Sequence, residues 1–450
     1  MASVFAKTLL APTGWKSNVR MSFDDRGIQS LELDGVASAA DERHEIIIPG
    51  MPNLHSHAFQ RGMAGLAETR GAGEDSFWSW RDIMYRFALS MTPDHAQAFA
   101  AQLYVEMLEA GFTRVGEFHY LHHDLDGSPY GDIAEMAARI AGAAAETGID
   151  LTLLPVFYAH STFGGAAPNE GQRRFVNSLA SFEKLYARCE RIIGDMPGAN
   201  LGVAPHSLRA VTQAELAAVT RLAGSGPKHI HIAEQMKEVD DCLAWSGKRP
   251  VEWLLDHVAV DASWCLIHAT HMTADETQRM AQSGAVAGLC PVTEANLGDG
   301  IFPGAAFIAA GGAYGVGSDS NVLIGIGDEL RQLEYSQRLL HRSRNVMAGQ
   351  AGSTGRALFD GALRGGTTAL GAESGLEVGR PASFVSLSAD VADVYAGDAA
   401  LDAWIFANAV KPDDVWVRGR KLVSEGRHVH RDEIETRFSS ALRQVISASQ

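Results

Sequence analysis

The stretch Asn53-Leu54-His55-Ser56-His57 shows the pattern that decides the fold, because a short apolar run ends there in residues that can do chemistry. Seven more apolar runs of strand length follow, separated by helical stretches. The eight runs cover residues 53–57, 113–119, 151–158, 201–205, 228–233, 264–268, 285–290 and 313–317. Eight strands alternating with helices predict an α/β fold, a (β/α)8 TIM-type barrel. A doubly wound open sheet is the alternative.

The helical stretches have recognisable beginnings. Thr92-Pro93 is typical of an N-cap followed by proline in the first helical position. The pairs Thr212/Glu215 and Thr273/Glu276 have the spacing of capping boxes. These signals place helices between the predicted strands.

The two ends of the chain have a different pattern. Short strand-like runs at 19–23 and 28–33 flank the turn Asp24-Asp25-Arg26-Gly27, and similar runs recur at 45–48, 382–387, 403–406 and 415–418. Arg418-Gly419-Arg420-Lys421 is a candidate hairpin turn. We therefore expect residues 1–48 and 376–428 to form one small β-sandwich domain beside a barrel of residues 49–375. Residues 429–450 are expected to form a C-terminal helix.

Composition excludes several classes of partner. The formal net charge of −16 would repel nucleic acid and anionic membrane surfaces. No window is apolar enough to span a bilayer, and the first twelve residues do not resemble a signal peptide. The four cysteines stand far apart, which is typical of reduced thiols. We expect a cytoplasmic protein with a small-molecule substrate.

The first and fifth predicted strands carry paired histidines. His55 and His57 are two residues apart on an extended chain, so their imidazoles share a face and can reach one metal ion. The fifth strand reads Lys228-His229-Ile230-His231-Ile232-Ala233-Glu234. His231, nearer its C-terminal end, is the candidate ligand, and His229 is interpreted as a packing residue. Regular strand geometry would turn Glu234 to the opposite face, so the chain is expected to leave the strand before it.

Two further strands also end in polar residues. The sixth ends at His268, and the eighth is followed by Gly317-Ser318-Asp319. In a barrel, the C-terminal ends of all strands meet at one mouth, where such enzymes place their chemistry. The sequence therefore predicts one site that gathers side chains from strands 1, 5, 6 and 8.

These residues match motifs of the amidohydrolase superfamily, which the chain resembles over nearly its whole length. The matching stretches are Pro49-Gly50-Met51-Pro52-Asn53-Leu54-His55-Ser56-His57, His231-Ile232-Ala233-Glu234, Cys290-Pro291-x-x-x-Ala295-Asn296-Leu297, Gly317-Ser318-Asp319 and Gly375-Leu376-Glu377-Val378-Gly379-Arg380-Pro381-Ala382. The resemblance implies that His55, His57, His231 and Asp319 bind one zinc ion per chain. It also implies that Glu234, His268 and Asp319 act in proton transfer. Members with two metals usually carry a lysine after strand 4, which the segment 203–209 lacks.

More narrowly, the chain resembles the formimidoylglutamate deiminase family of histidine degradation. The supporting stretches are His55-Ser56-His57-Ala58-Phe59-Gln60-Arg61-Gly62-Met63, Phe77-Trp78-Ser79-Trp80-Arg81 and Gly116-Glu117-Phe118-His119-Tyr120. This resemblance implies hydrolysis of N-formimino-L-glutamate to N-formyl-L-glutamate and ammonia by a homodimer. It further implies substrate contacts from Gln60, Arg81, Tyr120, His206 and Arg209.

The chemistry of that substrate gives an independent argument. N-formimino-L-glutamate has two carboxylates, and an acidic protein must hold them with local cations. Arg81 and Arg209 both follow predicted barrel strands, and arginine binds carboxylates in bidentate geometry. A surface salt bridge is the alternative for either residue. Likewise, the aromatic cluster Phe77, Trp78 and Trp80 is either a lid or wall of the pocket or ordinary core packing.

Two other functions are weighed against this one. A deaminase of guanine or another purine-like ring would use the same metal chemistry, but it would favour aromatic stacking over two arginines. A non-catalytic scaffold of the same fold should have lost a metal ligand, and the four candidate ligands are all present.

Overall fold

The computed structural model describes residues 1–70, 76–349, 352–388 and 394–449, and it confirms the predicted barrel. Each of the eight expected runs forms a strand, with the fourth split into two short pieces at Gly202-Val203. All neighbouring barrel strands pair in parallel. They are β5 (Met51–Ser56), β6 (Phe112–His119), β7 (Asp150–Phe157), β8 (Asn200–Leu201), β9 (Ala204–Pro205), β10 (Lys228–Ile232), β11 (Trp264–His268), β12 (Val286–Leu289) and β13 (Ala313–Val316).

Two short seams close this sheet on itself. The segment after β13 pairs with the end of β5, where Asp319 N–H donates to His55 C=O and His57 N–H donates to Asp319 C=O, each at 3.0 Å. On the other side, Val203 pairs with Lys228. Because both seams are hydrogen-bonded, the open doubly wound sheet is ruled out.

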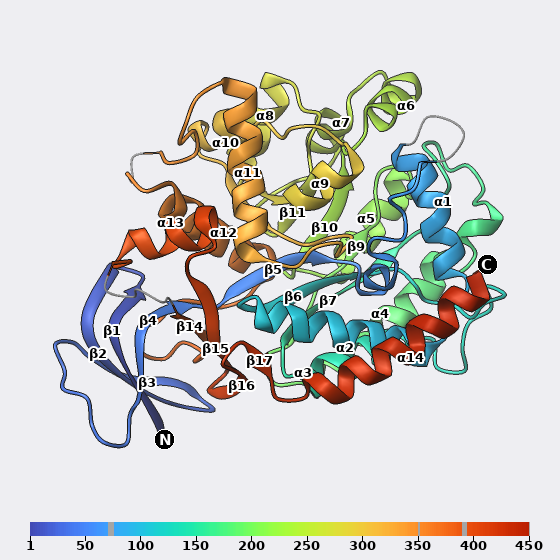
Figure 1. The fold of residues 1–450 in the computed structure, drawn as a ribbon. Helices are drawn as coiled ribbons and strands as arrows, with labels where there is room; N and C mark the ends of the chain where they lie inside the picture. The colour runs from blue at the N-terminus through green and yellow to red at the C-terminus, as the bar shows by residue number, and fades with distance from the viewer. Residues whose placement is uncertain (71–75, 350–351, 389–393, 450) are drawn as a thin grey trace.

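Helices surround the barrel (Figure 1). The three predicted caps are confirmed, since the side chains of Thr92, Thr212 and Thr273 each accept a backbone N–H three residues on. The helices are η1 (Ala58–Met63), α1 (Phe77–Ala88), α2 (Pro93–Glu109), α3 (Glu135–Thr147), η2 (Glu170–Gln172), α4 (Leu179–Gly194), α5 (Gln213–Leu222), α6 (Met236–Ser246), α7 (Pro250–His257), α8 (Ala274–Ser283), α9 (Pro291–Leu297), α10 (Gly304–Ala309), α11 (Ile326–His341) and α12 (Thr354–Ala369). Among the described helices, none has the length and hydropathy needed to cross a membrane.

Both chain ends contribute strands to one sheet beside the barrel, as predicted (Figure 1). Its strand order is β17-β16-β15-β14-β4-β1-β2-β3. The predicted turn at Arg418-Gly419 is confirmed, because both residues have positive φ (49° and 79°), as a two-residue hairpin of right-handed twist requires. The strands are β1 (Ala2–Ala11), β2 (Gly14–Asp24), β3 (Gly27–Glu32), β4 (Glu42–Pro49), β14 (Phe384–Ser388), β15 (Lys411–Val417), β16 (Arg420–Ser424) and β17 (Arg427–His428).

One predicted strand is wrong. Residues 403–406 lie in a helix, α13 (Asp398–Ala407), which packs against α11 and α12. Its buried residues include Leu401, Trp404 and Ile405, a spacing of three to four that fits one helix face. A four-residue apolar run is too short for its periodicity to separate strand from helix.

The predicted C-terminal helix is confirmed as α14 (Arg431–Ser449). It lies along α2, on the outside of the barrel (Figure 1). Its apolar face buries Ile434, Ala441 and Val445. All four cysteines are buried and free, as expected for reduced thiols.

Helix α12 lies unusually close to β13, which allows a test of the packing. A Cβ atom at Gly365 would lie 1.8 Å from the carbonyl oxygen of Tyr314. We expect Gly365→Ala to destabilise the protein by about 3 kcal/mol, the upper end for overpacked cores, and to lower the melting temperature by several degrees. The control is Gly194→Ala, an exposed helical glycine with nothing within 4 Å of the added atom. Equal melting temperatures for the two variants would contradict the close packing of α12.

Candidate active site

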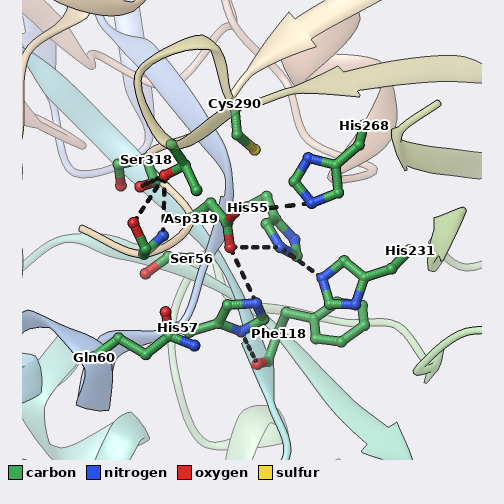
Figure 2. A network of polar contacts seen from close by, with 12 residues as sticks. His55, Ser56, His57, Gln60, Phe118, His231, His268, Cys290, Ser318 and Asp319 are labelled. Carbon is green, nitrogen blue, oxygen red and sulfur yellow. Dashed lines mark hydrogen bonds and ion pairs between the residues drawn. The ribbon is translucent and has the colours of Figure 1, made fainter. Parts of the chain in front are cut away.

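Three imidazoles and one carboxylate meet at the mouth of the barrel (Figure 2). The Nε2 atoms of His55 and His231 are 3.0 Å apart. Asp319 Oδ1 lies 3.4 Å from His55 Nε2 and 3.2 Å from His57 Nε2. The Nδ1–H of His57 donates to the carbonyl oxygen of Phe118 at 3.0 Å, which leaves its Nε2 free to bind a metal. These four residues are the predicted ligands, and their donor atoms all lie within 4.8 Å of one another.

Electrostatics favour a cation at this position. Burial lowers the pKa of His55 to about 3, and burial also lowers that of His231. Burial alone would raise the pKa of Asp319, but hydrogen bonds from His55 and His57 hold it well below its usual range. Two neutral imidazoles and an ionised carboxylate, buried and close together, form the donor set that a divalent metal binds.

Unusual backbone conformations at the strand ends set the direction of the side chains in the site. Ala233, His268 and Asp319 have φ values of 51°, 66° and 45°, in the left-handed region that non-glycine residues rarely adopt. At Ala233 this conformation ends β10 and turns the chain, so that Glu234 lines the same pocket as His231. The expected departure from the strand before Glu234 is therefore confirmed. The main-chain N–H groups of Ala233 and Glu234 both donate to the Glu238 carboxylate, at 3.3 and 3.2 Å.

His268 and Glu234 face the metal ligands from the other strands. His268 Nε2 lies 3.7 Å from Glu234 Oε1 and 3.8 Å from Asp319 Oδ2. Although burial lowers the pKa of His268, the carboxylates of Glu234 and Glu294 raise it to about 10. Burial in turn raises the pKa of Glu234. The group can thus hold and move protons beside a metal ion.

All five predicted substrate contacts line one pocket together with three of the four candidate metal ligands. Its walls include Gln60, Arg81, Tyr120, His206 and Arg209 beside His57, His231, Glu234, His268 and Asp319. Phe77 and Trp80 also line it, while Trp78 stacks against the guanidinium of Arg81 at 4.5 Å. The aromatic cluster is therefore part of the pocket wall. His229 lies outside the pocket, and its Nε2 contacts the carbonyl oxygen of Ala369 at 2.8 Å, as expected for a packing residue.

Within the described parts of the chain, neither of the two pocket arginines, Arg81 and Arg209, forms an ion pair, and the buried Nε of each has no hydrogen-bond acceptor. Burial lowers the pKa of Arg209, but the Glu238 and Glu234 carboxylates outweigh it and raise that pKa. The Arg209 guanidinium therefore stays charged, and the donors of both arginines are available to a ligand.

Two residues of the pocket and one residue behind it were not predicted from the sequence. Tyr158 follows directly on β7 and so obeys the same strand-end rule as the metal ligands. Tyr85 lies one helical turn after Arg81 on α1 and faces the same pocket. Glu294 is one of the unspecified positions of the Cys290–Leu297 motif, yet its Oε1 lies 3.2 Å from His268 Nδ1. A rule based on strand ends alone could have found only Tyr158.

Comparison with known proteins identifies the family. The model of the "Amidohydrolase family" matches residues 46–422. The chain belongs to the amidohydrolase family. Residues 1–45 of this amidohydrolase match the model "Formimidoylglutamate deiminase HutF, N-terminal domain".

Individual relatives agree with the family model. A formimidoylglutamate deiminase of Pseudomonas aeruginosa is 49% identical over 99% of this chain and 100% of its own length. The crystal structure of an amidohydrolase from Brucella melitensis is 61% identical and superposes with a TM-score of 0.98, covering 99% of this chain and 100% of that one. An adenosine deaminase from Xanthomonas campestris with bound zinc shares the fold, with a TM-score of 0.79 at 20% identity, covering 99% of this chain and 98% of that one.

The arrangement of the ligands predicts the effect of removing one. His231→Ala leaves three donors at the centre, so we expect it to lose nearly all bound metal and activity. His229→Ala, two residues earlier on β10, removes an imidazole that packs away from the pocket and should keep the metal. The metal content of each purified variant, measured by elemental analysis, checks this. Two metals per wild-type chain, or a His231→Ala variant that retains its metal, would contradict the assigned ligand set.

Proposed function

We propose that this amidohydrolase is a zinc-dependent enzyme that hydrolyses N-formimino-L-glutamate to N-formyl-L-glutamate and ammonia. The observation that carries the proposal is that two partly buried arginines, with no ion pair among the residues that the structure describes, share a pocket with the histidine and aspartate cluster. The relative from Pseudomonas aeruginosa, named formimidoylglutamate deiminase, supports the choice of substrate. Zinc is proposed because three imidazoles and one carboxylate suit it, although such ligands also accept iron or manganese.

The pocket suits a substrate with carboxylates at one end and a formimino group at the other. Arg81 and Arg209 would each bind a carboxylate through two N–H groups. Gln60 Nε2 donates to Tyr120 Oη at 2.9 Å, and Gln60 Oε1 is buried without a donor among the described residues. That oxygen can accept an N–H of the formimino group. His206, whose Nδ1 contacts Ser207 Oγ at 3.2 Å, presents the rest of its ring to the same space.

Hydrolysis requires a proton to move from water to the leaving nitrogen. A bound zinc ion supplies Lewis acidity, which lowers the pKa of water toward about 7. Asp319 and His268 accept or stabilise the proton of the attacking water. Glu234, whose pKa is raised by burial, delivers a proton to the imino nitrogen as the oxygen adds to the formimino carbon. The added hydroxyl then gives up its proton to form the formyl C=O, the C–N bond breaks, and the nitrogen takes up this second proton and leaves as ammonia. The proton first taken from the water restores Glu234.

A panel of substrates tests this function directly. Ammonia release should be fast with N-formimino-L-glutamate and much slower with N-formimino-L-aspartate, guanine and S-adenosylhomocysteine. Deamination of guanine at a comparable rate would favour the purine-like alternative, and no release from any of them would favour a scaffold. We also propose that the enzyme works as a cytoplasmic homodimer, which light scattering of the purified protein would check.

A substitution of Glu234 tests whether this residue is a proton donor or a metal ligand. Glu234→Gln should keep the metal but lower kcat by roughly 10²–10⁴-fold, because it removes a proton donor and leaves every proposed ligand in place. Glu190→Gln, on the exposed face of α4, makes the same change far from the pocket and should leave kcat unaltered. Metal content and kcat are measured together. A Glu234→Gln protein without metal would mean that Glu234 is a ligand.

The arginines provide a test of the substrate. Arg209→Met or Arg81→Met should lower kcat/KM for N-formimino-L-glutamate by roughly tens to thousands of fold, mainly through KM, because a buried carboxylate loses its partner. Metal content should not change. Arg221→Met, on the exposed surface of α5, is the matched control. The loss should be smaller for an analogue that lacks one carboxylate, and an equal loss on both compounds would assign the arginines to structural support.

A further inference from the structure

The guanidinium of Arg81 lies over two aromatic rings of its own helix. Trp78 stands three residues before Arg81 on α1 and Tyr85 four residues after it, a spacing that puts the three side chains on one helix face. The central carbon of the guanidinium is 4.5 Å from the centre of the Trp78 ring and 5.4 Å from the centre of the Tyr85 ring. Both distances are within the range of a cation–π interaction. We call Trp78 and Tyr85 the Arg81 cradle.

Neighbouring residues hold both rings of the cradle in place. The Trp78 ring meets the ring of Phe77 edge-on, with the ring centres 5.1 Å apart, and Phe77 is itself buried. The Tyr85 ring lies 5.7 Å from the ring of the fully buried Phe175. It also packs against Gly171, where a Cβ atom would lie 2.9 Å from Tyr85 Cδ2. The rings therefore give the guanidinium a fixed surface to lie on.

Aromatic rings suit an arginine that must bind an anion. Among the described residues Arg81 has no ion pair, and its buried Nε has no hydrogen-bond acceptor. A carboxylate partner would occupy the N–H groups and repel a second carboxylate. A ring face attracts the positive charge but leaves the N–H groups, which lie in the plane of the guanidinium, to a ligand. The cradle can thus hold Arg81 without competing for its donors.

We propose that Trp78 and Tyr85 are positioning residues that hold the Arg81 guanidinium toward a substrate carboxylate. The inference rests on the proposed function, because it takes Arg81 as the partner of that carboxylate. An arginine that is already held loses less side-chain entropy when the substrate binds. Trp78 is not among the described residues that line the pocket, so its effect on the substrate must pass through Arg81.

Trp78→Leu tests the cradle without changing the pocket wall. It keeps an apolar side chain but removes the ring face, so we expect KM for N-formimino-L-glutamate to rise by roughly 3- to 30-fold with little change in kcat. Trp78→Phe keeps a smaller ring and should raise KM less. The control is Trp245→Leu on α6, which removes an indole that stacks on Phe163 and should leave KM unchanged. A wild-type KM in Trp78→Leu would overturn the proposal.

Two substitutions of Tyr85 separate its ring from its hydroxyl group. Tyr85→Leu removes the ring and should raise KM about as far as Trp78→Leu. Tyr85→Phe keeps the ring and should raise KM much less. If both variants lose equally, the hydroxyl group carries the effect, and the assignment of Tyr85 to the cradle is wrong.

A double-mutant cycle shows whether Trp78 acts through Arg81. In an Arg81→Met background, Trp78→Leu should lower kcat/KM little further, because the cation is already gone. Losses that simply add would mean that Trp78 supports the helix, and they would overturn the proposal. Lys237 Nζ lies 5.9 Å from the same ring, but it is exposed and pairs with Asp241 at 2.7 Å. Lys237→Met should therefore leave KM unchanged.

Two analogues separate this proposal from failure of the proposed function. N-formimino-2-aminobutyrate and 4-(formimidoylamino)butanoate each lack one carboxylate, and Arg81 serves only one of them. The analogue that is insensitive to Arg81→Met should also be insensitive to Trp78→Leu, with metal content and melting temperature as in wild type. If the wild-type protein releases no ammonia from N-formimino-L-glutamate, the proposed function fails and the inference fails with it. If it does so while Trp78→Leu loses equally on both analogues, only the cradle fails.

Discussion

The hydrogen bonds between Asp319 and the His55–His57 strand end are the contact on which the rest of the structure depends. The main chain of Asp319 closes the barrel by pairing on both sides of Ser56, and its side chain lies between the two imidazoles. The last seam of the barrel and the metal centre are therefore one set of residues. Loss of metal would leave buried donors facing one another across this seam.

The backbone at the mouth of the barrel is strained at three residues, and neighbouring side chains stabilise these conformations. Ala233, His268 and Asp319 adopt left-handed conformations that cost of order 1–3 kcal/mol each. Hydrogen bonds to buried carboxylates offset this cost. Glu238 accepts two N–H groups after β10, and Glu294 contacts His268 and accepts the N–H of Cys290 at 2.9 Å. Such acids resemble catalytic groups in composition but serve to hold the backbone.

Much of the fold and site was predictable because, in a barrel, residues at the C-terminal ends of different strands lie close together in space. The ends of β5, β10 and β11, and the segment after β13, meet at one mouth, so polar residues there could be grouped without knowing any distance. The helix α13 was missed because four apolar residues fit either periodicity. Strand β1 was also missed. It pairs with β2 and with β4, and these two strands are separated along the chain by β3 and the loop that follows it. Tyr85 and Glu294 reach the site through helix geometry, which strand ends do not reveal.

The sheet that joins strands from both chain ends has a consequence for folding during translation. Strand β4 lies between β1 and β14, and β14 is made only after the whole barrel has been translated. At about 5–20 residues per second, the N-terminal strands wait tens of seconds on the ribosome with an exposed edge. A chain interrupted near residue 380 would therefore carry a complete metal centre and an unpaired edge, and aggregation rather than loss of chemistry would limit its yield.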